Sequence, residues 1–179
     1  MSIYSFKIGD YACRVPHKFL LSFLAMAAPP TPATAEAAGE KPEAVLDEAA
    51  KLNGTAGTPY AGFVRWGLLE NLKIAKELGL LTPENMEELK RGKTATITKG
   101  EYVGQEAEAD HVIPRAVCPE LQNQVMNLEL LLAKINRSKS DKVGERQMVF
   151  GKELHDAGLL SEAGWAAIQK KAATAGDNP

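Results

Sequence analysis

Hydrophobic positions in the first half of the chain recur at helical spacing. Between residues 60 and 78 the apolar side chains follow the period of an α-helix and predict one long helix with a single apolar face. A shorter helix is predicted over 41–53, because Pro42 suits a first helical turn and an Asn-Gly pair follows. A third helix is expected over 82–91, with Thr82 as its N-cap.

The pattern then changes to the alternation typical of strands. Residues 95–98 alternate with β-branched side chains, and 106–113 predict a longer strand that Pro114 ends. A further strand is predicted over 127–131, and two or three helices are expected from about residue 132 to the end. The expected fold class is therefore α+β.

Composition limits the possible classes of protein. The chain has 179 residues, of which 45% are hydrophobic and 25% charged, as in a soluble globular protein of one domain. Its formal charge of −2 argues against nucleic-acid binding through bulk positive charge, so a site for a polyanion must be local. Cys13 and Cys118 do not form a CxxC pair, which disfavours a zinc knuckle or a disulfide framework.

The N-terminal segment has the order of a secretory signal peptide. Ten apolar residues at 19–28 follow basic side chains and precede the small-residue triplet at 33–35. We therefore expect residues 1–35 to be a signal peptide and the mature protein to be periplasmic or secreted, without a membrane anchor. The alternative is a buried or amphipathic N-terminal helix in a cytoplasmic protein.

The residues that could take part in catalysis or metal binding lie in three short segments. They are Asp110-His111-Val112-Ile113-Pro114, Asn127-Leu128-Glu129-Leu130-Leu131 and Asn136-Arg137-Ser138-Lys139-Ser140-Asp141. The intervals are 16 residues from His111 to Asn127 and 9 from Asn127 to Asn136. This arrangement resembles the HNH endonuclease signature, and its last part resembles the HNH domain of the RNA-guided CRISPR nucleases. The resemblance covers about residues 101–142 and implies a ββα-metal core flanked by N- and C-terminal helices.

Phosphodiester hydrolysis requires an activated water and a positive charge near the phosphate oxygens. Histidine ionises near neutral pH, so His111 is the candidate general base. Asp110 and Asn136 offer hard oxygen ligands, which favour Mg²⁺ or Mn²⁺. Strand alternation would separate Asp110 from His111 unless the strand ends or bulges there, as nearby Pro114 suggests. The resemblance implies that Asn127 fixes the loop that orients His111 and does not bind metal.

A local basic face is expected around the predicted helix of this unit. The segment 134–146 carries a net charge of +3 in a chain that is otherwise acidic. Such groups bind phosphates without reading base sequence. The candidate nucleic-acid-binding residues are Arg115, Lys134, Arg137, Lys139 and Lys142.

These features predict five segments: a signal peptide over 1–35, a linker with a short helix over 36–58, supporting helices over 59–99, the ββα core over 100–142 and helices over 143–179. The expected function is a divalent-metal-dependent DNA endonuclease of low sequence specificity. The alternative is a non-catalytic, metal-stabilised binding module. RNA as substrate and the oligomeric state stay open.

Two further side chains have simpler interpretations. Cys118 is expected to be a small packing residue. His155 is expected to be a capping or surface histidine.

Overall fold

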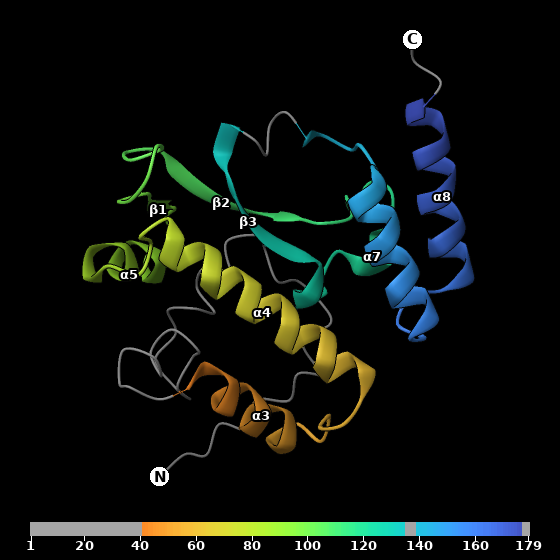
Figure 1. The fold of residues 1–179 in the computed structure, drawn as a ribbon, viewed down its shortest axis with the longest axis horizontal. Coiled ribbons are helices and arrows are strands. Elements are labelled where there is room, and N and C mark those ends of the chain that lie inside the picture. Colours follow the sequence, from red (N-terminus) through yellow and green to blue (C-terminus); the bar gives the residue numbers. More distant parts are fainter. Residues whose placement is uncertain (1–40, 135–138, 177–179) are drawn as a thin grey trace.

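A small antiparallel sheet lies against one long helix, and further helices lie at the ends of this layer (Figure 1). The computed structural model describes residues 41–134 and 139–176. The strand order is β1-β2-β3, formed by Ala95–Thr96, Glu106–His111 and Leu128–Leu132. Helices combined with an antiparallel sheet confirm the expected α+β class.

The predicted helices form close to their expected bounds. Three precede or flank the first strand: α3 (Pro42–Leu52), α4 (Pro59–Glu77) and α5 (Pro83–Lys90). The N-cap at Thr82 is confirmed, because its hydroxyl accepts a hydrogen bond from the amide of Asn85. The chain continues after the sheet with α7 (Glu145–Asp156) and α8 (Glu162–Gly176).

The strands were also predicted well, with small differences at their ends. The strand β2 ends at His111, two residues before the expected end, and β3 starts one residue late because the 3₁₀ turn η3 (Val125–Asn127) precedes it. A second 3₁₀ turn, η2 (Pro119–Leu121), lies in the connection between β2 and β3. This connection therefore has its own folded structure.

Two hydrophobic clusters share the helix α4. The first fills the space between the sheet, α3, α4 and α5, and includes Leu68, Leu72, Ile97, Leu128 and Leu130. The second joins the β2–β3 connection to α7 and α8, and includes Ile113, Met126, Phe150, Leu154 and Ile168. Val64 of α4 packs on both. The C-terminal helices thus pack on the β2–β3 connection.

Helix α4 approaches η3 closely and forms buried hydrogen bonds with β3. A Cβ atom on Gly67 would lie 3.2 Å from the Cα of Met126, so a larger residue would push the two backbones apart. One turn later, the buried amide of Asn71 donates to the carbonyl of Leu128 and accepts from the amide N–H of Leu130. Asn71 therefore satisfies backbone groups on the outer edge of the sheet.

Several predictions concern residues outside the described ranges. The proposed signal peptide falls entirely within 1–40, and Asn136 and Arg137 fall within 135–138. Ala133, Lys134 and Lys139 are helical, so helical structure borders the second gap on both sides. Among the helices of the described ranges, none combines the length and apolar character needed to cross a membrane.

Replacing Asn71 by Leu should destabilise the fold. The substitution leaves buried backbone groups of Leu128 and Leu130 without partners, which costs about 1–3 kcal/mol for each group. The free energy of unfolding from urea denaturation measures the loss. Glu70→Leu, on the exposed side of the same helix, is the matched control and should change stability by less than about 0.5 kcal/mol. Equal effects of the two substitutions would contradict this role of Asn71.

Candidate active site

The antiparallel register of β2 and β3 brings two acidic residues face to face. Asp110 on β2 pairs directly with Glu129 on β3, and directly paired residues project to the same face of a sheet. Glu129 is only 5% exposed. Two carboxylates in this position repel one another, so the pairing requires a cation nearby.

Lys139 supplies that cation. Its Nζ lies 2.9 Å from Asp110 Oδ2 and 2.9 Å from Glu129 Oε1. The same ammonium donates to the backbone carbonyl of His111. The Lys139 side chain is only 12% exposed, so these are interior contacts with little screening by water.

Arg146 of α7 completes the ion network from the solvent side. One of its terminal nitrogens lies 2.5 Å from Glu129 Oε2. Both carboxylate oxygens of Glu129 therefore face a positive charge. The Arg146 side chain stays 61% exposed, so a soluble polyanion can still reach it.

His111 is buried and held by the β2–β3 connection. Its Nε2 lies 2.8 Å from the carbonyl oxygen of Gln122, and the residue is 3% exposed. A carbonyl can only accept a hydrogen bond, so in the neutral imidazole Nε2 carries the proton and Nδ1 the lone pair. Strand pairing persists through His111. Alternation therefore sends its ring to the opposite side of β2 from the Asp110 carboxylate, which instead contacts Lys139. The expectation that an early strand end or a bulge brings both side chains to one site is wrong, because the strand continues through His111.

Asn127 fastens this connection to the strand. Its Oδ1 accepts from the amide N–H of Ile113, and its Nδ2 donates to the carbonyls of Ile113 and Leu121. The residue is fully buried, so these bonds do not compete with water. Leu121 directly precedes Gln122, so the amide of Asn127 restrains the backbone that holds the His111 ring.

The predicted basic residues lie in different environments. Arg115, Lys134 and Lys142 are exposed. Lys139 is instead enclosed by the two carboxylates, and Arg137 lies outside the described residues. Three of these five predicted phosphate-binding side chains are therefore accessible in the described parts of the chain.

The oxygen atoms around Lys139 are of the kind that bind a hard divalent cation. Within the described ranges, no group of three or more His, Cys, Asp or Glu side chains is placed to hold a metal. Two carboxylates and the His111 carbonyl nevertheless converge on a single positive charge. Carboxylate and carbonyl oxygens suit Mg²⁺ and Mn²⁺, so the residues present fit such an ion.

Sequence reasoning missed Glu129 and the site role of Arg146. Glu129 stands two residues after Asn127, on the strand predicted to pair with the one that carries Asp110. The pairing register was the signal needed to find it, because register decides which side chains share a face. Arg146 was counted among the basic residues, but its contact with Glu129 depends on how α7 packs on the sheet.

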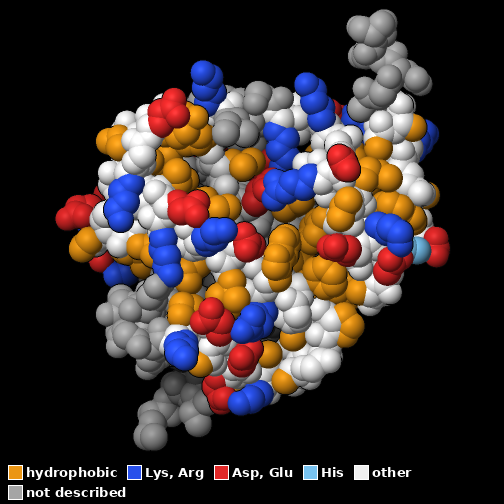
Figure 2. Space-filling model, in the orientation of Figure 1, with side chains coloured by type: hydrophobic (Ala, Val, Ile, Leu, Met, Phe, Trp, Pro, Cys, Tyr) orange, Lys and Arg blue, Asp and Glu red, His pale blue; other side chains and the backbone are white. Residues whose placement is uncertain are grey.

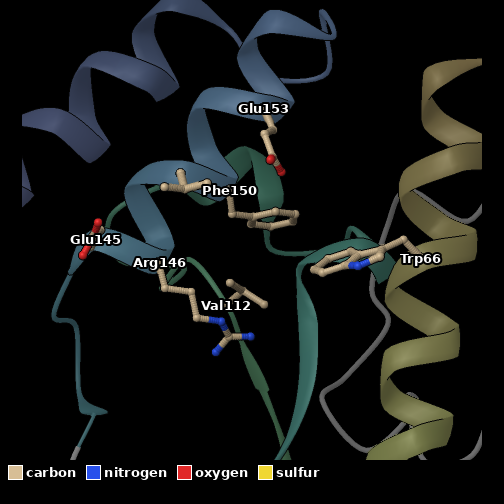
Figure 3. A pocket seen from close by; sticks show the side chains of 7 residues that line it. Trp66, Val112, Glu145, Arg146, Phe150 and Glu153 are labelled. Carbon is tan, nitrogen blue, oxygen red and sulfur yellow. The ribbon is translucent and has the colours of Figure 1, made fainter.

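An apolar groove opens beside this network. It has a volume of about 470 Å³. Hydrophobic side chains reach the surface between α4 and α7, with charged side chains around them (Figure 2). Trp66 on α4 faces Phe150 on α7, with Arg146 and Val112 along one side (Figure 3). The Trp66 and Phe150 ring centroids are 5.7 Å apart, and Trp66 stays 47% exposed.

The remaining cysteine and histidine predictions agree with the structure. Cys118 is 1% exposed, and burial together with the nearby Glu120 carboxylate raises the pKa of its thiol to about 11. A protonated, buried thiol is a packing group and a poor nucleophile. His155 lies at the surface, where its Nε2 contacts Glu162 at 2.9 Å and its ring stacks on Trp165.

Comparisons with known proteins identify no relative. No protein-family model matches the chain, and no curated protein or solved structure is significantly similar to it.

The raised pKa of Cys118 predicts a pH-dependent loss of stability. The thiol is protonated in both states below pH 9, whereas between pH 9 and about 11 it ionises more readily in the unfolded chain. Stability should therefore fall over this range. The measurement is urea unfolding at several pH values in a Cys13→Ser background, with Cys118→Ala as the control that lacks the effect. Parallel profiles for the two proteins would contradict it.

Proposed function

We propose that the protein is a divalent-metal-dependent endonuclease of the HNH type that hydrolyses DNA with low sequence specificity. The observation that carries this proposal is the oxygen-lined cation position at the end of β2, formed by Asp110 and the backbone of His111. The cation position supplies one chemical element that phosphodiester hydrolysis needs, and the His111 ring, on the opposite side of β2, would supply the general base.

In the proposed reaction, the imidazole of His111 takes a proton from the attacking water. The hydrogen bond to Gln122 holds the ring, and Asn127 restrains the backbone behind it. Asp110 and Asn136 would hold a Mg²⁺ or Mn²⁺ ion, which when bound would neutralise charge on the phosphate and leaving oxygens. Arg115, Lys134 and Lys142 are exposed and would position the nucleic-acid backbone.

This mechanism requires substrate to reach a buried ring. His111 is 3% exposed, so the groups that cover it must move when nucleic acid binds. Export of the chain stays a prediction from its N-terminal segment.

A second candidate is a non-catalytic binding module that uses the same cation position for stability. The groove between Trp66 and Phe150 favours this alternative, because an exposed tryptophan beside an arginine is typical of contact surfaces. This module would leave DNA intact, whereas a divalent metal would still raise its melting temperature.

Replacing His111 by Gln should lower nicking of supercoiled plasmid, in Mg²⁺ or Mn²⁺, by about 10²-fold or more. Glutamine can still donate to the Gln122 carbonyl but cannot accept a proton from water, so the substitution isolates the catalytic step. His155→Gln is the matched control and should nick at the unsubstituted rate. Unfolding curves check that each variant folds.

Equal nicking by the His111→Gln variant would reject the proposed catalytic role. Plasmid that stays supercoiled with the unsubstituted protein, together with a melting temperature that rises with Mn²⁺, would favour the binding module.

A further inference from the structure

Lys139 uses all of its hydrogen-bonding capacity in the site. An ammonium has three donor hydrogens, and Nζ of Lys139 has three oxygen partners, from Asp110, Glu129 and the backbone of His111. The two carboxylate contacts are both 2.9 Å. The three oxygens thus form a small, fully used cation position, called here the oxygen seat.

Without a cation, repulsion between the Asp110 and Glu129 carboxylates would destabilise the oxygen seat. Asp110 and Glu129 face each other across the β2–β3 pair, and their side chains are only 22% and 7% exposed. The exposed Arg146 contacts only the second oxygen of Glu129. Among the described residues, removing Lys139 therefore leaves two poorly solvated carboxylates with one positive partner, so another cation should be attracted to the seat.

Nothing in the seat is specific for an ammonium. Its donors are two carboxylate oxygens and one carbonyl oxygen, the atom types that bind Mg²⁺ and Mn²⁺. We propose that Lys139 and a divalent metal ion compete for this seat, with Glu129 as an additional metal ligand, so that metal binding displaces the lysine. The inference rests on the proposed function, which places a metal at Asp110.

The exchange would change the local charge in the direction that a phosphate requires. With Lys139 in place, two acids and two bases sum to zero. With a divalent ion in its place, the same carboxylates and Arg146 leave a net charge of +1. The displaced ammonium is then available for a phosphate, which is the role that the sequence predicted for Lys139.

The backbone beside Lys139 is held in an unusual conformation. Ser140 has a φ of +52° and is the one non-glycine residue with positive φ among those described. This conformation costs free energy for an L-residue. Asp141 then forms an ion pair of 2.6 Å with Lys171 on α8, which anchors the chain after the turn. Release of Lys139 from the seat would allow Ser140 to relax.

The test measures Mn²⁺ affinity by titration calorimetry on the full chain without nucleic acid. Lys139→Met removes the competing ammonium, so this variant should bind Mn²⁺ at least about tenfold more tightly than the unsubstituted protein. Glu129→Gln should bind it about tenfold more weakly. Lys142→Met, which removes the same charge from an exposed neighbour, is the matched control and should change affinity by less than about threefold.

Thermal unfolding gives a second readout that does not depend on activity. In EDTA, Lys139→Met should melt below the unsubstituted protein, and Mn²⁺ should raise its melting temperature by more than it raises that of the unsubstituted protein. If the methionine variant does not fold, Lys139→Gln tests the same point, because glutamine is neutral but can still donate hydrogen bonds.

Unchanged or weaker Mn²⁺ binding by the variants of Lys139 would overturn the inference, as would a lack of binding to every protein. The results distinguish a failure of the proposed nuclease function from a failure of the proposed competition between Lys139 and the metal. Tighter binding by Lys139→Met without any nicking would keep the competition and reject the nuclease. Nicking that depends on His111, with unchanged Mn²⁺ affinity in Lys139→Met, would keep the nuclease and reject the competition.

Discussion

The antiparallel register of β2 and β3 is the constraint on which the rest of the structure depends. It places Ala107 and Ala109 with alternate leucines of β3 on the face that α4 covers, and it places Asp110 opposite Glu129 on the other face. A shift by one residue would exchange the faces, bury the acids against α4 and expose the leucines. The core and the ion network are therefore two consequences of one pairing.

Buried asparagines hold this register where backbone pairing stops. Asn71 binds the outer edge of β3, Asn85 exchanges two hydrogen bonds with Thr96 of β1, and Asn127 closes the connection after β2. An amide side chain has a donor and an acceptor, so it can replace a missing strand partner at one residue. Of the three, Asn127 restrains the backbone that follows β2, next to His111.

The ion network joins the end of β2 to elements that come later in the chain. Lys139 follows β3, and Arg146 is on the first turn of α7, yet both contact Glu129. Ions in a poorly solvated place interact strongly and must be balanced. The position of α7 is therefore coupled to the charge at the end of β2, and the same helix forms one wall of the groove that contains Trp66.

The sequence by itself determined the element types, most of their bounds and the α+β class, whereas the roles of Asp110, His111 and Asn127 stay predictions from it. These depend on local signals, such as periodicity, caps and turn residues, which act within a few residues of the chain. The tertiary structure decided that Glu129 faces Asp110, that Lys139 is enclosed, and that His111 is buried against Gln122. Such contacts join residues distant in the chain, and register and helix packing set them.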